Sequence, residues 1–464
     1  MDHGNHLALL TDLYQLTMAQ SYFQSKKLEP ATFSLFIRSY PPNRGYFVSA
    51  GLEDVLSFLK DFSFDSEALS YLRSTRLFAD DFLHFLRGLR FTGEVWAIPE
   101  GRLCFKDEPI LEITAPIIEA QIVETFVINQ INLQALIATK ASRCAYAAKG
   151  RAVVDFSLRR THGADAGMKV ARSSYLAGFA GTSNVLAGKR YGIPIVGTMA
   201  HSFVSSFDHE IDAFRSFVRS FPGNSILLID TYDTLTGAHK AVEVAREMAA
   251  RGERLQGVRI DSGDLATLGR EVRRIFDEAG LKEVKIIGSG GLDEYDLAEL
   301  SASEAPFDSY GVGTKMGVSS DAPWFDMAYK LVQHNGRPVL KLSTGKVSLP
   351  GGKQVFRLVD DKGRLRKDIL GLRSEELPGS EPLLQKVMGK GRMLEPYPSL
   401  KEIRERFLEE FSRLGERIKA ILDPEFYPVE LSPRLKALKA EIEEQLARTE
   451  IDLSAHPARA LGES

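Results

Sequence analysis

Residues 151–317 alternate short apolar runs, rich in β-branched residues, with stretches that are apolar on one helical face. The apolar runs, each predicted as a strand, are 153–158, 194–199, 226–230, 257–261, 284–289 and 309–314. Between two of them, Leu268, Val272 and Ile275 recur at helical spacing, and Gly280 stands where that helix would end. Strands that are apolar on both faces and alternate with amphipathic helices predict a parallel sheet covered by helices, either as a closed barrel or as an open doubly wound sheet.

Polar residues at the ends of the predicted strands favour the barrel. Nearly every strand is followed by a reactive or phosphate-friendly group: Arg159 and Arg160, Thr198 and His201, Asp230, Asp261, Ser289 with Gly290 and Gly291, and Gly313 with Thr314. In barrels, functional groups gather at the carboxyl ends of many strands, whereas an open sheet concentrates them at one switch point. We therefore predict an α/β protein built on an irregular α/β barrel.

The chain on either side of this region follows other patterns. Residues 1–150 mix predicted helices at 10–23, 53–61 and 80–86 with predicted strands at 32–39 and 46–50, and end in a long helix from Pro116 to about Ala148. Residues 329–464 begin with two hairpin-like units that turn at Asn335-Gly336 and Lys362-Gly363, and continue with predicted helices at 400–422 and 433–448. We expect parts at 1–150, 151–328 and 329–464, with the two terminal parts packing together as an additional α+β domain.

Composition and charge disfavour several classes of protein, among them nucleic-acid-binding, membrane-spanning and disulfide-rich proteins. The hydrophobic content of 44% and charged content of 26% are ordinary for a globular protein, and a net charge of −3 gives no overall attraction to nucleic acid or membrane. Cys104 and Cys144 have no CxxC spacing. The apolar stretch 117–138 is interrupted by acidic and amide residues, and the N-terminus lacks a basic segment followed by an apolar run. We expect a cytoplasmic protein without a membrane span.

Two glycine-rich turns are the first candidates for chemistry. GSGGLDEYD follows the apolar residues 284–287, and YGVGTKMG is a second glycine-rich turn one strand–helix unit later, with Thr314 and Lys315 added. Small residues after a strand let backbone N–H groups approach phosphate oxygens, and paired turns at the last two strands are a recurring phosphate site in barrels. The alternative is that glycine merely allows a tight turn between strand and helix.

Charged residues at other strand ends suit anionic ligands. Arg259 can grip a carboxylate with two parallel hydrogen bonds, and Asp261 or Asp230 could accept ribose hydroxyls or reach Mg²⁺ through water. A structural Arg–Asp pair is the alternative, and Asp264 just beyond has no separate role from the sequence. His201 follows Thr198 at the mouth of a strand, where imidazole can act as acid, base or nucleophile.

The segments LLTDLYQLTMA, GTSNVLAG, GTMAHSF, LIDTYD, VRIDSGDL and GVGTKMG occur in this order along the chain. Together they resemble the nicotinate phosphoribosyltransferase family over nearly the whole length. The resemblance implies an α/β barrel with a domain from both termini, working as a homodimer. It also implies the formation of nicotinate mononucleotide and pyrophosphate from nicotinate and 5-phosphoribosyl 1-pyrophosphate, with Mg²⁺ and coupled ATP hydrolysis, in NAD salvage.

The resemblance also implies roles for individual residues. By position in these segments, His201 is similar to a transiently phosphorylated histidine, and Tyr14, Thr198, Arg259 and the ring of Phe156 are similar to nicotinate contacts. A phosphoribosyl pyrophosphate contact is implied for Thr314, with Gly290, Gly291 and Gly313 lining the phosphate site. Arg159 and Arg160 are expected at the same substrate from their charge, because arginines clustered at a strand end suit a polyphosphate. Whether Tyr14 acts within its own subunit or across the dimer stays open. The cysteine cluster that binds zinc in some relatives is absent, so we expect no zinc, and His162 receives no role.

In the implied reaction, the protein chiefly orients the two reactants and stabilises the charge on the departing pyrophosphate. The pyridine nitrogen attacks the anomeric carbon as pyrophosphate leaves, so Arg159, Arg160 and Mg²⁺ would neutralise pyrophosphate while Asp230 or Asp261 fixes the ribose hydroxyls. Ser183 disfavours the sister enzyme that uses nicotinamide, because amide-using relatives carry an aspartate at the matching place. A catalytically silent barrel that serves as a binding module is the alternative from another class.

Overall fold

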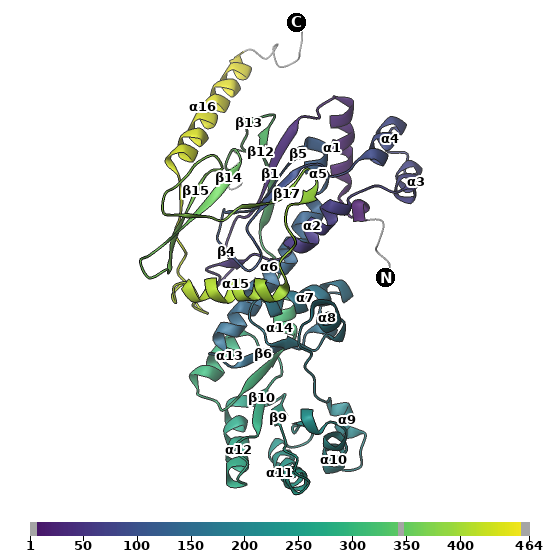
Figure 1. The fold of residues 1–464 in the computed structure, drawn as a ribbon, viewed down its shortest axis with the longest axis vertical. Coiled ribbons are helices and arrows are strands. Elements are labelled where there is room, and N and C mark those ends of the chain that lie inside the picture. Colours follow the sequence, from purple (N-terminus) through teal and green to yellow (C-terminus); the bar gives the residue numbers. More distant parts are fainter. Residues whose placement is uncertain (1–6, 342–347, 456–464) are drawn as a thin grey trace.

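The computed structural model describes residues 7–341 and 348–455 of the chain. Its central element is a six-stranded sheet in the order β7-β6-β11-β10-β9-β8, in which all neighbouring strands are parallel. The strands are β6 (Ala152–Asp155), β7 (Gly181–Thr182), β8 (Ile226–Leu228), β9 (Gly257–Ile260), β10 (Lys285–Gly288) and β11 (Ser309–Val312). The sheet is curled into a half-barrel and lies at the bottom of Figure 1.

Helices follow the strands as the apolar pattern predicts. They are η2 (Leu158–Arg160), α7 (Ala164–Leu176), α8 (Val185–Tyr191), α9 (His201–Ser205), α10 (Glu210–Ser220), η3 (Pro222–Asn224), α11 (Thr234–Ala250), α12 (Leu265–Glu278), α13 (Glu294–Ala302) and α14 (Thr314–Gly317). Asp233, Asp264 and Asp293 cap α11, α12 and α13 by accepting hydrogen bonds from backbone N–H groups of the first turn. Asp264, whose role the sequence left open, is therefore a helix cap.

The prediction of a strand at 194–199 is wrong. This segment makes one isolated bridge, between Thr182 and Ile195, and forms no ladder. Two backbone hydrogen bonds, from Thr182 N–H to the Pro194 carbonyl and from Val196 N–H to the Thr182 carbonyl, are the whole of this pairing. Pro194 has no N–H to donate, and Ile195 is 59% exposed, so the apolar run does not continue as a buried strand. The parallel pairing therefore stops at β7 on one edge and at β8 on the other, and the sheet is not a closed barrel. The strand missed by the sequence pattern is β7, which has only two residues.

The segments on either side share one antiparallel sheet. N-terminal elements are η1 (Leu7–Leu9), α1 (Leu13–Gln24), β1 (Pro30–Ile37), β2 (Phe47–Val48), α2 (Leu52–Asp61), α3 (Ser66–Ser74), α4 (Asp80–Gly88), β3 (Glu94–Ala97), β4 (Leu103–Cys104), β5 (Pro109–Pro116), α5 (Ile117–Ile122) and α6 (Glu124–Ala147). Later elements are β12 (Met327–His334), β13 (Arg337–Pro338), β14 (Lys353–Val359), β15 (Leu365–Leu372), β16 (Glu381–Pro382), β17 (Gln385–Gly389), β18 (Arg392–Met393), α15 (Leu400–Arg413), β19 (Val429–Leu431) and α16 (Pro433–Ala455).

One seven-stranded sheet, ordered β13-β12-β1-β5-β3-β17-β18, joins strands from both ends of the chain. A four-stranded sheet, β16-β14-β15-β19, and the short pair β2-β4 complete this part, which lies above the half-barrel in Figure 1. Helices α6 and α15 run between the two regions in the same view. Both predicted hairpins are confirmed where described, and Asn335 and Gly336 both have positive φ, as a two-residue hairpin turn requires. The first hairpin prediction covers residues 329–343, and its last two residues, 342–343, lie outside the described residues.

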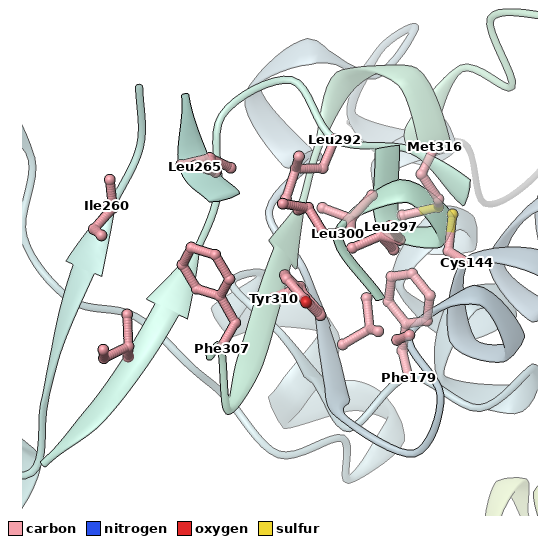
Figure 2. Packing of buried hydrophobic residues seen from close by; sticks show 14 of the residues in the cluster. Cys144, Phe179, Ile260, Leu265, Leu292, Leu297, Leu300, Phe307, Tyr310 and Met316 are labelled. Atoms are coloured by element: carbon pink, nitrogen blue, oxygen red, sulfur yellow. The ribbon is translucent and has the colours of Figure 1, made fainter. Parts of the chain in front are cut away.

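Three further helix predictions need correction. The long helix from Pro116 is divided at Val123 into α5 and α6, the predicted helix at 400–422 ends at Arg413, and α3 was not predicted. Two clusters of buried apolar side chains support the two regions. Figure 2 shows part of the half-barrel cluster, where Leu297 and Leu300 of α13 lie between Tyr310 of β11 and Met316 of α14. No helix in the described part of the chain is long and apolar enough to cross a membrane.

Candidate active site at the strand ends

Arg259, near the end of β9, is the centre of a polar cluster. Its Nη1 donates to Asp261 Oδ1 at 2.8 Å and to Ser289 Oγ at 3.1 Å, and its Nη2 donates to the carbonyl of Met199 at 2.8 Å. Ser289 Oγ donates in turn to Asp261. The Arg259 side chain is only 11% exposed, and burial lowers the pKa of its guanidinium although Asp261 opposes this. Asp230 acts on the guanidinium in the same direction as Asp261, but the pKa still lies below its usual value, so the buried cation can accept a further anionic partner.

Asp230 connects the end of β8 to the end of β9. Its Oδ2 accepts hydrogen bonds from the backbone N–H of Asp261 at 3.0 Å and from Ser262 Oγ at 2.6 Å. Its Oδ1 is buried and has no hydrogen-bond partner among the described residues. Because a buried carboxylate oxygen without a donor is costly, this atom suits a hydroxyl, a water molecule or a cation brought by a ligand.

His201 lies at the start of α9 with its ring facing the same cluster. Its Nδ1 is 3.1 Å from Thr231 Oγ1, and its Nε2 is 3.9 Å from Asp261 Oδ2. The side chain is 45% exposed. A tautomer in which Nδ1 donates to Thr231 leaves Nε2 with a free lone pair, which is the arrangement that a nitrogen nucleophile needs.

The turn at Gly290 and Gly291 packs directly against the end of β9. Both glycines have positive φ, and a Cβ at Gly290 would lie 1.8 Å from the carbonyl oxygen of Asp261. The backbone after Ser289 can approach Asp261 this closely only because residue 290 has no side chain. A Cβ at Gly291 would meet open space, so that residue faces away from the packed core.

The end of β6 presents Phe156 beside the second glycine turn. The Phe156 N–H donates to the carbonyl of Val312 at 2.8 Å, which holds the ring next to β11. A Cβ at Gly311 would lie 2.4 Å from two carbons of this ring. Asp155 is buried and accepts hydrogen bonds from Ser157 and, at 2.7 Å, from Thr182 Oγ1, and burial raises its pKa. It is therefore a structural carboxylate that ties β6 to β7.

The remaining predicted contacts lie at strand ends and are open to solvent to different degrees. Arg159 and Arg160 are exposed on η2, and their side chains form no hydrogen bond or ion pair within the described residues. Thr314 is exposed at the start of α14, where Gly313 precedes it. Ser183 and Thr198 are half-buried, and the N–H of Ser183 donates to the Asp155 carbonyl at 2.8 Å.

Tyr14 is the predicted site residue that the chain does not bring to this cluster. It lies on α1, 49% exposed, and lines a separate cavity of about 420 Å³ with residues of α6 and the segment 323–324. Besides Tyr14, the lining residues are Asp12, Glu124, Thr125, Ile128, Asn129, Asn132, Leu133, Leu136, Pro323 and Trp324. None of them belongs to the half-barrel strand ends. Burial, followed by Glu124 and Asp12, raises the pKa of Tyr14.

The carboxylates of this cluster fit Mg²⁺ only in company with a phosphate ligand. No group of three or more His, Cys, Asp or Glu side chains in the described ranges is arranged to hold a metal ion by itself. Asp230 Oδ1 is unpartnered and Asp261 is 34% exposed, so both could take part through water. This matches the usual preference of Mg²⁺ for one or two carboxylates, several waters and substrate phosphates.

Three members of the cluster were not singled out from the sequence. Thr231 contacts His201, Ser262 contacts Asp230, and Ser289 contacts Arg259. Ser289 was considered in the sequence only as part of a glycine-rich turn. Thr231 and Ser262 each follow a strand-end aspartate, and that position was the signal available. The structure thus defines an α/β protein with a polar cluster at the carboxyl ends of its parallel strands, centred on a buried arginine.

Comparison with known proteins places this cluster in a family. Models of the nicotinate phosphoribosyltransferase N-terminal domain, of the nicotinate phosphoribosyltransferase family and of its C-terminal domain match residues 9–132, 151–346 and 379–439. A nicotinate phosphoribosyltransferase of Mycobacterium tuberculosis is 49% identical over 92% of each chain, and one of Bacillus subtilis is 37% identical over 95% of this chain and 97% of its own. The crystal structure of human nicotinic acid phosphoribosyltransferase is 31% identical, with a TM-score of 0.85 over 93% of this chain and 99% of that one. The chain belongs to the nicotinate phosphoribosyltransferase family.

Proposed function

We propose that this protein is a nicotinate phosphoribosyltransferase that forms nicotinate mononucleotide in NAD biosynthesis. In this reaction the pyridine nitrogen forms a bond to the anomeric carbon of 5-phosphoribosyl 1-pyrophosphate, and the carbon–oxygen bond to pyrophosphate breaks. Family membership supports the reaction, and the buried guanidinium of Arg259 is the observation that carries the choice of an anionic base. Its partial neutralisation by Asp261 leaves positive charge for the nicotinate carboxylate.

The strand-end residues divide the remaining tasks. Phe156 stacks on the pyridine ring, with Thr198 and Ser183 beside the base, and the exposed Arg159 and Arg160 bind pyrophosphate. The backbone at Gly290, Gly291, Gly313 and Thr314 binds the sugar phosphate through N–H groups. Asp230 and Asp261 fix the ribose hydroxyls, which uses the unpartnered Oδ1 of Asp230. Holding both reactants in line while stabilising the leaving charge supplies the rate enhancement.

Asp230 and Asp261 would hold Mg²⁺ through water beside the pyrophosphate of the substrate, where the ion would neutralise the charge that develops on the leaving group. Asp230 and Asp261 contribute through water, because the chain supplies no complete set of metal ligands within the described residues. We expect EDTA in excess over Mg²⁺ to abolish turnover, and added Mg²⁺ to restore it. The melting temperature should hardly change, since no structural metal is lost. A fall in melting temperature that parallels the lost activity would contradict a substrate-borne metal.

ATP is the proposed co-substrate and His201 the residue that accepts its terminal phosphoryl group. Nε2 attacks the γ-phosphorus, a nitrogen–phosphorus bond forms, and the bond to ADP breaks; water later hydrolyses the phosphohistidine. The added negative charge beside Asp261 and the sugar-phosphate turns reorganises the site before the pyridine attacks.

The proposed assembly is a cytoplasmic homodimer in which the terminal segments form an additional α+β domain. The separate position of Tyr14, away from Arg259 in its own chain, supports a contribution across the dimer. The seven-stranded sheet, which joins N- and C-terminal strands, supports the additional domain.

Parallel assays with nicotinate and nicotinamide test the proposed function. The purified protein is incubated with either base, phosphoribosyl pyrophosphate, ATP and Mg²⁺, and the products are separated by chromatography. We expect nicotinate mononucleotide with nicotinate and little product with nicotinamide. Nicotinamide mononucleotide as the main product would identify the amide-using sister activity, and no nucleotide from either base would support a silent binding module.

A glycine substitution tests the stacking role of Phe156. Gly311→Ala places a methyl group where the Phe156 ring lies, so the ring must move. We expect the KM for nicotinate to rise by about tenfold, within the 1–3 kcal/mol range of overpacking, with a smaller change for phosphoribosyl pyrophosphate. Gly223→Ala is the matched control, because a Cβ there meets nothing within 4 Å. Unchanged nicotinate kinetics in Gly311→Ala would remove Phe156 from the base site.

A further inference from the structure

A buried charged cluster lies behind the two glycine-rich turns, and the proposed reaction does not use it. Its members are Arg44, Lys140, Arg143, Glu294 and Asp321. The side chains are 0–1% exposed except for that of Asp321, which is 24% exposed. Since charged groups are rarely buried so completely without a partner, the arrangement of these partners is specific.

Lys140, on the long helix α6, joins the two halves of this cluster. Its Nζ contacts Glu294 Oε2 and donates to Asp321 Oδ1 at 2.7 Å. Glu294 is the first residue of α13, three positions after Gly291, and Asp321 lies four positions beyond the last residue of α14, Gly317. One ammonium group therefore holds the segments that follow both glycine turns.

A second ion pair links the turns directly to each other. Lys315, beside Thr314 in the second turn, donates to Asp296 at 2.8 Å and lies 3.7 Å from Asp293. Asp293 and Asp296 form the capping box of α13, which starts after the first turn. The two turns are thus fixed relative to each other by Lys315, which is partly exposed, and by Lys140, which is buried.

The cluster keeps Lys140 charged despite its burial. Burial alone would lower the pKa of Lys140, but the neighbouring carboxylate of Glu294 raises it above the ordinary value. Glu294 has two further cations, since Arg143 Nε donates to it at 3.0 Å and Arg44 Nη1 lies at 3.6 Å. For neutralising Glu294 alone, Lys140 is redundant. Arg44 also bridges Glu294 to Asp321, since its Nη2 donates to Asp321 Oδ1 at 3.1 Å and to Oδ2 at 3.0 Å. The distinctive contribution of Lys140 is that it ties both carboxylates to α6.

We propose that Lys140 is a positioning residue that sets the spacing of the two glycine-rich turns and so determines the affinity for the sugar phosphate. This inference rests on the proposed function, because the turns are taken to bind the phosphorylated ribose. A rigid bridge from α6 holds the backbone N–H groups of both turns in place before the ligand arrives, which lowers the ordering cost of binding.

Lys140→Met tests the bridge, with Lys353→Met as the matched control. Lys353 is a buried lysine of β14 that lies 3.0 Å from Glu112 of β5, and neither strand adjoins a glycine-rich turn. Arg373 remains to neutralise Glu112 when the lysine is removed. Each variant therefore removes one buried lysine whose glutamate keeps an arginine partner. A purely structural role would lower the melting temperature of both and change substrate affinities in neither.

The measurements are the KM values for both substrates, kcat, and ribose 5-phosphate binding by calorimetry. In Lys140→Met we expect the KM for phosphoribosyl pyrophosphate and the Kd for ribose 5-phosphate to rise by about tenfold. The KM for nicotinate and kcat should stay within about twofold, the pattern of lost ground-state binding. Lys353→Met should keep wild-type values. Equal changes in both KM values, or unchanged ribose 5-phosphate binding, would overturn the proposal.

Failure of the proposed function and failure of the role proposed for Lys140 give different results. If wild-type protein binds ribose 5-phosphate but does not convert nicotinate, the function fails while the calorimetry still decides the role of Lys140. If Lys140→Met does not fold, Asp321→Ala removes the other end of the same bridge at a partly exposed position. It should raise the Kd for ribose 5-phosphate in the same direction, and wild-type binding in that variant would refute the bridge.

Discussion

Replacing Arg259 with alanine is expected to weaken the use of nicotinate by about 2–5 kcal/mol in kcat/KM, the scale for truncating one partner of a buried charge pair. The guanidinium connects Asp261, Ser289 and the Met199 carbonyl, so its loss removes the proposed clamp on the nicotinate carboxylate. Phosphoribosyl pyrophosphate binding should change much less, because the glycine turns remain. Steady-state kinetics with each substrate varied in turn measure this difference.

Arg259→Lys is the control for this substitution. Lysine keeps the charge near Asp261 but cannot form two parallel hydrogen bonds to a carboxylate, so a large part of the loss should persist. Circular dichroism and the melting temperature must show that both variants are folded. Full nicotinate turnover by Arg259→Ala at low substrate would show that the carboxylate is bound elsewhere.

His201→Asn is expected to abolish ATP hydrolysis and acid-labile labelling from γ-labelled ATP while leaving slow, ATP-independent synthesis. Asparagine retains similar size and one hydrogen bond toward Thr231 but has no ring nitrogen to accept a phosphoryl group. Arg259, Asp261 and the glycine turns still orient the reactants, so the pyridine can attack without the coupled step. The assays are phosphate release, product formation with and without ATP, and gel autoradiography under alkaline conditions.

A structural role for His201 predicts a different result. If the ring only supported the fold, His201→Asn would lower thermal stability and reduce all activities in proportion. His239→Asn is a control for nonspecific labelling, because His239 lies on α11 and is not part of the strand-end cluster. Labelling and ATPase activity that persist in a folded His201→Asn protein would rule out the phosphohistidine.

The polar cluster could be predicted from the sequence because of one geometric fact about parallel strands. Whatever their separation along the chain, their carboxyl ends meet at the same edge of the sheet. The residues at the end of one strand, Arg259 and Asp261, therefore meet Asp230 from a second strand and His201 from a third apolar run, as their hydrogen bonds and ion contact show. The predicted position of His201 is correct although 194–199 is not a strand, because this segment still leads the chain to the strand ends of the half-barrel.

What the sequence did not predict depends on contacts that no local pattern records. The apolar run at 194–199 looks like a strand until its exposure and its lack of a ladder are seen. Lys140 occurs in an otherwise buried helical stretch, and its partners Glu294 and Asp321 are more than a hundred residues away. The sequence could support only the helix there, because charges that pair in the interior with residues distant along the chain leave no periodic signature.

The seven-stranded sheet has a consequence for the synthesis of the chain. Strand β3 pairs with β5 on one side and with β17 on the other, and β1 has β12 as its second neighbour. While the ribosome is still translating the half-barrel, β1, β5 and β3 can already be joined, but their outer edges have no strand to pair with. Such open edges can associate with other nascent chains. The sheet is complete only after residues 385–393 emerge, so the late-made strands protect the earliest ones from aggregation.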